Sequence, residues 1–454
     1  MKAVIVGAGE VGYHIASKLS REKKDVVVID LSEEKLRRVA ETLDVQTIHG
    51  SGSSPAVLNE AGLKSADLIV AVTDSDETNL VACVVAKAIS PGLTRIARIR
   101  NNEFLEIAEL RSNQVLGFSL LINPEAEVVK SITRLLEVPG AQDVIDFEEG
   151  LVRLIGLKIR PDSVLVGKTM AEMTSLDPDR HILIAAIHRD VQVIIPHGQT
   201  RLEAGDLAYM VVRPADIEAT LRFFRMPSSP VRSVFIAGGG QAGSLLAQDM
   251  ERKGIKVKLI EWDAERCRYL SQVLHKAIIL RGDATDQSLL EEENIADADV
   301  FIALTNSEEE NVLACLLAKR LGVRQTITRI NKFSYIPLIS AIGLDTVVSS
   351  RLSAVSAILR HIRKGKVVSA AALKGEDAEV LEFEALQTTD VVDRPIHEIR
   401  FPRQALIAAL IREGRVIVPT GKTVVKPNDR LIIIARREAI PKVEKALTVK
   451  LEYF

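Results

Sequence analysis

The sequence predicts an α/β fold with two doubly wound parallel-sheet domains, each followed by a small α+β domain. Three observations carry this prediction. Short apolar runs alternate with segments of helical periodicity, which is typical of parallel sheets built from βαβ units. A G-x-G-x-x-G pattern follows the first apolar run. The same arrangement then recurs in the second half of the chain, which indicates an internal duplication.

The first apolar run, residues 3–6, leads into the glycine pattern and then into a segment of helical character. We expect Gly7 to make a tight turn, Gly9 to let backbone N–H groups approach a pyrophosphate, and Gly12 to let helix and strand pack closely. The helix N-terminus would then direct its positive dipole end at the phosphates. A second apolar run ends in Asp30, which completes the opening of a Rossmann-like dinucleotide-binding unit.

The rest of this first lobe continues the alternation of strands and helices. The run 68–72 is apolar throughout, which is typical of a parallel strand buried on both faces. Proline in a first helical turn marks helix starts at Pro55 and Pro124. After Asp30 the predicted strands are 45–48, 68–72, 95–99 and 120–122, and the predicted helices are 32–42, one from Pro55, 79–89, 101–116 and 123–136.

The character of the chain changes after Pro139 and Gly140. Short apolar runs separated by turn signals predict strands at 151–159, 182–189, 191–195 and 207–212, hence a small α+β domain. A Pro-Ser-Ser-Pro stretch at 227–230 is typical of a linker and is expected to join the two halves. The predicted domains are 1–123 and 231–348 (the first and second lobes) and 139–225 and 368–453 (the first and second small domains).

The duplication preserves the residues that matter for ligand binding. The glycine pattern returns at Gly238, Gly240 and Gly243, and the acid Asp30 returns as Glu261. Longer phrases recur as well: "NLVACVVAK" at 79–87 becomes "NVLACLLAK" at 311–319, and "IIPHG" and "AGD" of the first small domain become "IVPTG" and "PND" of the second. A lone glycine pattern is weak evidence, whereas its recurrence with the same following acid is much stronger.

Bulk composition excludes several classes of protein. The chain has 454 residues, 47% hydrophobic and 26% charged, with a formal net charge of −2, which is an ordinary globular balance. The sequence has no long Lys/Arg run of the kind that would indicate a nucleic-acid partner. The three cysteines lack C-x-x-C spacing, so we expect reduced thiols and no metal site. Met1 leads directly into a strand and no apolar stretch approaches the roughly 20 residues of a membrane helix, so we expect a soluble cytosolic chain without a signal peptide.

Two sets of polar residues end predicted strands at the ligand edge of the sheet. A carboxylate after the second strand can accept both ribose hydroxyls and would repel a 2′-phosphate, so Asp30 and Glu261 favour NAD or an adenosine nucleotide over NADP. The alternative is an acid at an exposed strand end. Thr73 and Asp74 follow the fourth strand, where doubly wound sheets bind ligands, and helix capping is the alternative there.

Other residues leave two interpretations open. Arg98, repeated as Arg329, can meet phosphates or form a structural salt bridge. Trp262 can stack on an adenine, although packing is the commoner role and its counterpart Leu31 favours packing. Cys83 and Cys315 fall within apolar helices, where buried small side chains are expected. Ser51 stands where the second copy has Asp283, so the lobes differ at this ligand-edge position.

Missing groups bear on activity. The eight histidines are scattered, neither glycine-rich lobe brings a His–Asp pair to the ligand edge, and no G-x-x-x-x-G-K-[ST] pattern occurs. We therefore expect no catalytic residues: the lobes bind a nucleotide without transforming it. A nucleotide-sensing gating subunit is the first hypothesis. The alternatives are an NAD-dependent oxidoreductase and a free-standing nucleotide-binding regulator with another partner.

Four phrases carry a family resemblance: "VIVGAGEVG" (4–12), "ADLIVAVTDSDETNLVAC" (66–83), "RIARIR" (95–100) and "ADVFIALTNSEEENVLAC" (298–315). With them, nearly the whole chain resembles the peripheral subunits of bacterial and archaeal Trk potassium-uptake systems, whose halves are regulator of K⁺ conductance (RCK) domains. The small domains resemble the accessory carboxyl-terminal domain of that family.

The resemblance implies a cytoplasmic regulatory subunit, peripheral on the inner face of the cell membrane. It implies binding of NAD(H), with ATP or ADP as further ligands, and a homo-oligomeric ring, expected to be a tetramer, under a membrane potassium-transport subunit of the TrkH/TrkG type. Ser51, where many relatives carry an acid or another polar residue, is a departure. The nucleotide contacts that the resemblance implies are Gly7, Ala8, Gly9, Glu10, Val11, Asp30, Thr73, Asp74 and Arg98 in the first lobe, and Gly238, Gly239, Gly240, Gln241, Ala242 and Glu261 in the second.

Overall fold

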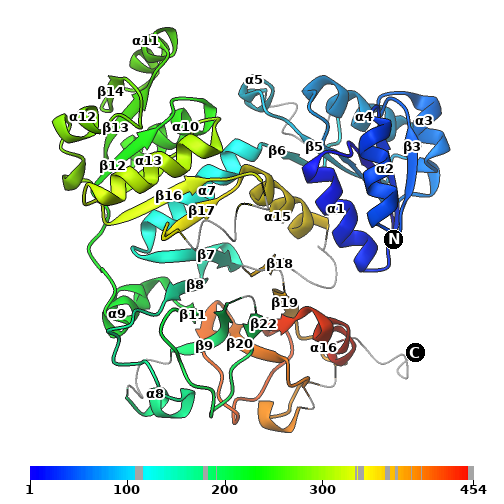
Figure 1. Ribbon diagram of the computed structural model, residues 1–454. Helices are drawn as coiled ribbons and strands as arrows, with labels where there is room; N and C mark the ends of the chain where they lie inside the picture. Colours follow the sequence, from blue (N-terminus) through cyan, green and yellow to red (C-terminus); the bar gives the residue numbers. More distant parts are fainter. Residues whose placement is uncertain are drawn as a thin grey trace.

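A computed structural model of the chain describes residues 1–107, 116–176, 182–190, 192–332, 335, 342–362, 369–373, 377–389, 391–399 and 401–447. Two parallel sheets and two smaller sheets make up the molecule, so the predicted fold class is confirmed (Figure 1).

The first lobe is a six-stranded parallel sheet in the order β3-β2-β1-β4-β5-β6. Its order reverses between β1 and β4, which places the ligand crevice at the carboxyl ends of these two strands. The strands are β1 (Lys2–Val6), β2 (Asp25–Asp30), β3 (Gln46–His49), β4 (Leu68–Ala71), β5 (Thr94–Arg98) and β6 (Leu120–Ile122), and the helices are α1 (Glu10–Arg21), α2 (Glu33–Thr42), α3 (Pro55–Glu60), α4 (Asp76–Ile89), α5 (Asn102–Glu106) and α7 (Pro124–Glu137).

One predicted helix of this lobe is not continuous over its described residues. The pattern predicts helix over 101–116, but α5 ends at Glu106 and Ile107 has extended backbone (φ −70°, ψ 111°). The rest of that prediction, 108–115, lies outside the described residues.

The second lobe repeats the topology, with the order β14-β13-β12-β15-β16-β17. The duplication therefore extends from sequence to sheet order. Its strands are β12 (Ser233–Ala237), β13 (Lys256–Glu261), β14 (Ile278–Arg281), β15 (Val300–Ala303), β16 (Gln325–Arg329) and β17 (Thr346–Val348), and its helices are α10 (Gln241–Arg252), α11 (Ala264–Val273), α12 (Gln287–Glu292), α13 (Glu308–Arg320) and α15 (Ser350–Ile362).

Each small domain is a five-stranded sheet whose strands pair antiparallel, in the orders β10-β9-β11-β8-β7 and β18-β19-β22-β20-β21. The sequence pattern missed β7, because the polar residues Gln142, Asp143 and Asp146 interrupt its apolar run and a bulge breaks its register beside Ala141. The elements are β7 (Ala141–Phe147), β8 (Val152–Lys158), α8 (Met170–Leu176), β9 (Leu183–Arg189), β10 (Gln192–Ile194), β11 (Leu207–Val212), α9 (Ile217–Phe223), β18 (Ser369–Ala372), β19 (Ala378–Glu384), β20 (Ala405–Arg412), β21 (Arg415–Ile417), β22 (Arg430–Arg436) and α16 (Ile440–Leu447).

The last helix of each lobe packs on the other lobe. In the core, Val128 and Ile132 of α7 join Leu246 of α10, whereas Ile358 of α15 joins Ile15 of α1 (Figure 1). The two helices also contact each other, and the Ser131 and Ser353 hydroxyls lie 3.4 Å apart. Each half thus contributes its last helix to the core of the opposite lobe, and we call this arrangement helix exchange. Because of it, each half depends on the other to complete its core.

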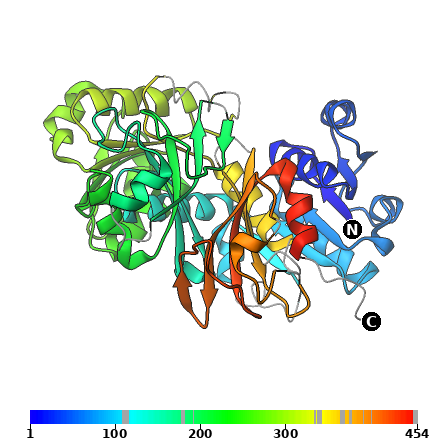
Figure 2. The ribbon, with the colours of Figure 1, turned by 90° about the horizontal axis from the view of Figure 1, so that it is seen from below.

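The two small domains share one hydrophobic core. Phe147 and Tyr209 of the first domain and Val380 and Ile432 of the second belong to the same buried cluster. The small domains lie beneath the two lobes (Figure 1), and the view from below shows strands of the two domains side by side (Figure 2). The small domains therefore pack together on one side of the molecule, and the two lobes face each other across the exchanged helices.

Candidate functional site

Three glycines lie in the turn between β1 and α1, and the protein itself requires only two of them. Gly7 has φ +109°, and a Cβ there would lie 3.0 Å from the Thr73 backbone nitrogen, so only glycine fits. A Cβ on Gly12 would lie 1.8 Å from the carbonyl oxygen of Gly7. Gly9 differs, because its φ of −67° suits any residue and a Cβ there would meet no protein atom within 4 Å. The protein itself therefore gives no reason for glycine at position 9.

The second lobe repeats this geometry. Gly238 has φ +97°, with a Cβ position 2.8 Å from the Thr305 backbone nitrogen, and a Cβ on Gly243 would lie 1.9 Å from the Gly238 oxygen. Gly240, like Gly9, faces open space. Gly239 is specific to this copy, since a Cβ there would lie 2.4 Å from Leu270, whereas the first lobe accommodates Ala8.

The helices that follow these turns begin without side-chain caps. Helices α2, α4, α11 and α13 each start with a Ser or Asp side chain that accepts a backbone N–H of the first turn. The N-cap residues of α1 and α10 are Gly9 and Gly240, which offer no such acceptor. The first N–H groups of both helices are therefore available to an anion, with the dipole favouring negative charge.

The acids that end β2 and β13 are bonded to the glycine turns. Asp30 accepts from the N–H of Ala8 at 2.6 Å and from that of Ser32 at 2.8 Å. Glu261 accepts in the same way from Gly239 at 2.7 Å and Asp263 at 2.9 Å. Each carboxylate oxygen keeps one lone pair for a further donor. These carboxylates are half-buried at the crevice edge, so they are not simply acids at exposed strand ends.

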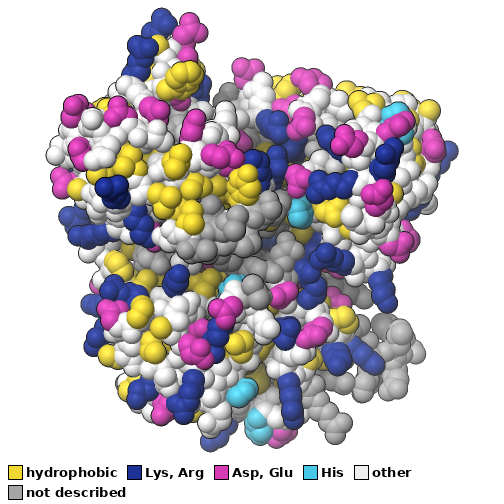
Figure 3. All heavy atoms as spheres, in the orientation of Figure 1, with side chains coloured by type: hydrophobic (Ala, Val, Ile, Leu, Met, Phe, Trp, Pro, Cys, Tyr) yellow, Lys and Arg dark blue, Asp and Glu magenta, His cyan; other side chains and the backbone are white. Residues whose placement is uncertain are grey.

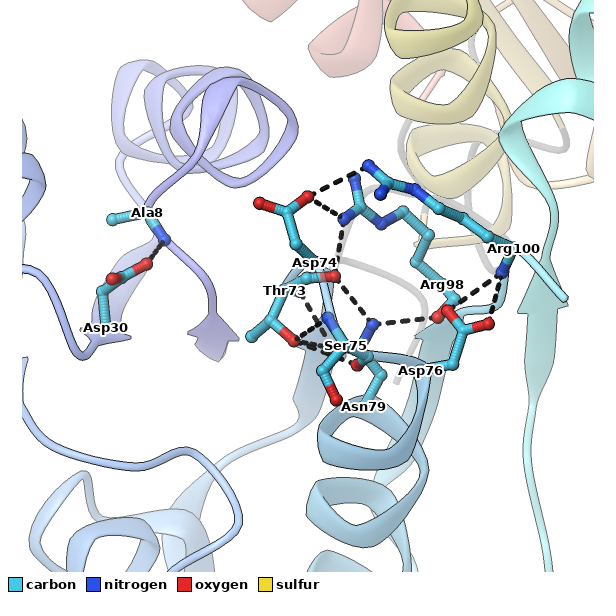
Figure 4. A network of polar contacts seen from close by, with 9 residues as sticks. All are labelled: Ala8, Asp30, Thr73, Asp74, Ser75, Asp76, Asn79, Arg98 and Arg100. Carbon is cyan, nitrogen blue, oxygen red and sulfur yellow. Dashed lines mark hydrogen bonds and ion pairs between the residues drawn. The ribbon is translucent and has the colours of Figure 1, made fainter.

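A buried asparagine joins the fourth strand to the fifth (Figure 4). Asn79 of α4 is fully buried, and its Oδ1 accepts from the N–H and the hydroxyl of Thr73, both at 2.8 Å. Its Nδ2 donates to the carbonyls of Thr73 (3.0 Å) and Arg98 (2.9 Å). The second lobe has the same four bonds around Asn311. Sequence reasoning missed this positioning role, although the asparagine opens the repeated phrase.

Arg98 makes ion pairs as well as backbone contacts. Its Nη2 donates to the Thr73 carbonyl and to Asp74 Oδ1 at 2.9 Å, and Arg100 also donates to that oxygen at 3.0 Å (Figure 4). Partial burial alone would raise the pKa of Asp74, but the hydrogen bond and charge of Arg98, with Arg100 and Lys35, hold it below its ordinary value. Burial, together with the charge of Arg100, lowers the pKa of Arg98.

The structural salt bridge expected as one role of these arginines is therefore present in both lobes. Arg329 donates to the Thr305 carbonyl at 2.7 Å, to Asn306 at 3.0 Å and to Glu125 of α7 at 3.3 Å. The Nε of Arg98 is buried without a hydrogen-bond partner among the described residues. The ligand edge of the first lobe therefore keeps an N–H donor, Arg98 Nε, for a ligand.

A family model of the TrkA-N domain matches residues 3–124 and 234–350, and a model of the TrkA-C domain matches 154–225 and 380–448. The Trk system potassium uptake protein TrkA of Halomonas elongata is 37% identical to this chain over 458 aligned residues, which cover 100% of both sequences. The chain belongs to the TrkA family.

Other comparisons agree with this membership. The Trk system potassium uptake protein TrkA homolog 1 of Methanosarcina mazei is 37% identical, covering 98% of this chain and 99% of that protein. A solved structure of the GsuK channel bound to NAD has a TM-score of 0.60 at 19% identity and covers 98% of this chain and 78% of that one. At that identity the likeness shows a shared fold. None of the helices described in this TrkA-family chain is long and apolar enough to cross a membrane.

Four side chains of the TrkA-N lobes test the predictions about packing. Trp262 is 79% exposed, so the packing interpretation is wrong: β13 ends at Glu261, and the indole extends from the crevice edge into solvent. Its counterpart Leu31 is 70% exposed. Cys83 and Cys315 are buried as predicted, and burial raises the pKa of each thiol to about 12.

The two TrkA-N lobes face each other across a cleft of about 720 Å³. The first lobe lines it with the loop from Asp74 and with the segment from Arg100, and the second lobe lines it with Gln241 and Arg266. Gln241 Nε2 donates a hydrogen bond across the cleft to the carbonyl of Arg100. The ligand edge of one lobe is thereby joined to the glycine turn of the other.

Proposed function

We propose that this chain is a nucleotide-binding regulatory subunit that gates a membrane potassium-uptake transporter. NAD(H) is the proposed ligand of the lobes, with ATP or ADP as further ligands. The observation that carries the proposal is the pair of uncapped helix starts at Gly9 and Gly240, where glycine is needed neither for the backbone nor for packing. A pyrophosphate against the helix N-terminus supplies the missing reason for glycine.

The acids support the choice of ligand. Asp30 and Glu261 are held by the glycine turns with lone pairs to spare, so they can accept ribose hydroxyls and would repel a 2′-phosphate. We assign nucleotide contact to Gly7, Ala8, Gly9, Glu10, Val11, Asp30, Thr73, Asp74 and Arg98, and to Gly238, Gly239, Gly240, Gln241, Ala242 and Glu261.

Gating follows from differential binding. A nucleotide that fits one arrangement of the lobes better than another shifts the population toward it, by no more than the difference in affinity. The proposed place of action is the inner face of the cell membrane, on a potassium-transport subunit of the TrkH/TrkG type. Full-length relatives named as Trk potassium-uptake proteins support this partner. We propose no catalytic residue in either lobe.

We also propose that copies of the chain assemble into a ring, with a tetramer as the expected state. Matching faces of α4 and α13 support it, because Val81 and Val84 are 45% and 40% exposed and Leu313, the counterpart of Val81, is 59% exposed. Figure 3 shows apolar side chains gathered on the face over α13. Repetition of an exposed apolar face in both lobes suits contacts between identical subunits.

The experiment is a calorimetric titration of NADH and ADP into the Gly9→Ser and Gly240→Ser chains. Serine is a good N-cap and meets open space, so folding should be unaffected, while its hydroxyl occupies the pyrophosphate position. We expect each variant to lose about tenfold in affinity, roughly 1.4 kcal/mol, at one site. Undiminished binding in both variants would overturn the nucleotide assignment.

The partner is tested separately. The tagged chain is incubated with membranes containing the potassium-transport subunit, with and without NADH, and the bound proteins are recovered. We expect the transporter to co-purify, and nucleotide to change potassium flux through it. Co-purification of a different protein, with the transporter absent, would contradict the partner assignment and favour a free-standing regulator.

A further inference from the structure

The cleft between the lobes brings together groups that the repeats do not share. Gln241 and Arg266 of the second lobe line it on one side and Arg100 of the first lobe lines it on the other. Its volume, about 720 Å³, is in the range of small-molecule sites. The glycine turn of the second lobe opens at this cleft, because Gln241 is the first residue of α10.

Arg100 is placed for a role in the second lobe. The hydrogen bond from Gln241 to its carbonyl puts Arg100 beside the uncapped start of α10. Its side chain is 49% exposed, and it pairs with Asp74 at 3.0 Å through Nη2. Guanidinium groups have five N–H donors, so further donors remain for a phosphate.

The second lobe lacks this arginine in its own sequence. The order Arg98-Ile99-Arg100 of the first lobe becomes Arg329-Ile330-Asn331 in the second. At the same time two acids of the first lobe are replaced by amides, Glu10 by Gln241 and Asp74 by Asn306. The second edge thus lacks these two acids, although Asp283 stands where the first lobe has Ser51, and it has no cation of its own at the place of Arg100.

A second guanidinium comes from the second lobe itself. Arg266 Nε donates to the carbonyl of Gly239 at 2.7 Å, which holds this side chain beside the glycine turn, and its guanidinium stacks on Tyr269 with 4.5 Å to the ring centroid. Four acids of the first lobe, Asp74, Asp76, Glu77 and Glu103, also line the cleft. Asp74 accepts from Arg98 and Arg100, and Asp76 accepts from the N–H groups of Arg100 and Asn101. Two arginines therefore border the phosphate end of this turn, one from each lobe.

We propose that the second nucleotide site is completed by the first lobe, with Arg100 as a cross-lobe contact for the phosphates of a nucleoside diphosphate or dinucleotide. The inference rests on the proposed function and deepens it. A ligand held in this way touches both lobes, so its affinity depends on how closely they approach. Occupancy of the second site then favours the closed cleft, because binding and closure are linked.

The test isolates the second site in the full-length chain by the substitution Asp30→Arg, which places a cation at the ribose position of the first site. ADP is titrated into this parent and into the same chain carrying Arg100→Ala. We expect about a tenfold loss of affinity, the equivalent of one charge-assisted contact. Because Arg100 is half-exposed, the variant is expected to fold, and circular dichroism checks this.

A matched control is Arg37→Ala in the same parent, since Arg37 is an exposed arginine of α2 that does not line the cleft. It should leave the affinity for ADP unchanged. Adenosine, which has no phosphate, should bind both chains equally weakly. Equal ADP affinity in the Arg100→Ala chain and its parent would overturn the cross-lobe contact alone, whereas no binding of ADP or NADH to the parent would overturn the second site of the proposed function as well.

Discussion

At the scale of single residues, the ligand edge is positioned by an asparagine that no ligand need touch. Asn79 uses its oxygen as a double acceptor and its nitrogen as a double donor, so its side chain is fully satisfied inside the protein. Aspartate has nearly the same shape but cannot donate. The residue thus fixes the carbonyls of Thr73 and Arg98 through groups that only an amide provides.

We predict that Asn79→Asp destabilises the chain by about 2–4 kcal/mol, because a buried carboxylate would face two carbonyl oxygens. Urea-induced unfolding measures the change. Asn59→Asp is the control: Asn59 is exposed on α3 and donates one hydrogen bond, to the Pro55 carbonyl at 2.8 Å, at the surface, so its loss should cost no more than about 1 kcal/mol. Similar stabilities of the two variants would show that the donor bonds of Asn79 are unimportant.

At the scale of elements, ion pairs connect α1 and α10, the helices that follow the glycine turns, each to the small domain of the other half. Lys18 of α1 pairs with Glu379 of β19, and both side chains are largely buried, with exposures of 12% and 3%. On the other side, Glu137 of α7 joins Lys253, just after α10, to Arg153 of β8, each at 2.7 Å. Any shift of α1 or α10 therefore acts directly on a small domain.

For the first of these links we predict that Glu379→Leu costs about 3 kcal/mol, because it leaves the Lys18 ammonium buried without its carboxylate. The double variant Lys18→Met/Glu379→Leu should recover part of that loss. The exposed pair Arg160–Asp162 is the control, and Arg160→Ala should cost less than about 1 kcal/mol. Chemical denaturation reports all three, and a Glu379→Leu chain as stable as the unaltered one would refute the link.

At the scale of the whole molecule, helix exchange makes each half incomplete. We predict that residues 1–228 expressed alone form a homodimer, in which α7 of each copy takes the place of α15 on the first lobe of the other. The buried positions of α7 and α15 are apolar in both, as Val128 and Ile132 and their counterparts Ala354 and Ile358 show. Light scattering after gel filtration measures the mass.

The substitution Ile132→Asp should abolish this dimer, because it buries a charge in the exchanged interface. A surface change on the same helix, Lys130→Ala, should leave the dimer intact, since Lys130 is exposed. A stable monomeric half-chain would contradict the dependence of each half on the other.

The contact between the small domains also makes stability depend on pH. Glu382 of β19 is 2% exposed, and burial raises its pKa to about 7, although Arg430 lies 3.3 Å away and also pairs with Glu148 of the other small domain. The folded chain holds this proton above the pH at which the unfolded chain releases it. The contribution of protonated Glu382 to the free energy of unfolding is therefore fully present below about pH 4.5 and is lost as pH rises through about 7.

We predict that Glu382→Gln, which cannot ionise, is more stable than the unaltered chain at pH 8 by about 1–2 kcal/mol, and that this gain shrinks toward pH 5. Thermal unfolding at several pH values measures it. Glu384→Gln, an exposed position on the same strand, should show no such trend. A pH-independent difference for Glu382→Gln would mean that burial does not set the titration.

The sequence alone predicted the features that depend on neighbours along the chain. The strands, the duplication and the special positions Gly7 and Gly12 follow from local periodicity and from backbone requirements that each residue imposes by itself. The prediction failed where polar residues broke a period, as in β7, or where helical spacing did not reveal the end of α5 at Glu106. It was also wrong about Trp262, because apolar character does not say what covers a side chain.

Only the tertiary structure decided which surfaces meet. The apolar stripe of α7 has helical spacing whichever lobe it covers, so its exchange with α15 could not be read from periodicity. The four bonds of Asn79 and the contact of Gln241 with Arg100 join residues distant in sequence, and no local pattern specifies such pairs. The physical reason is that backbone conformation is set by short-range sterics, whereas the choice of partner is set by the burial of apolar and polar groups across the whole chain.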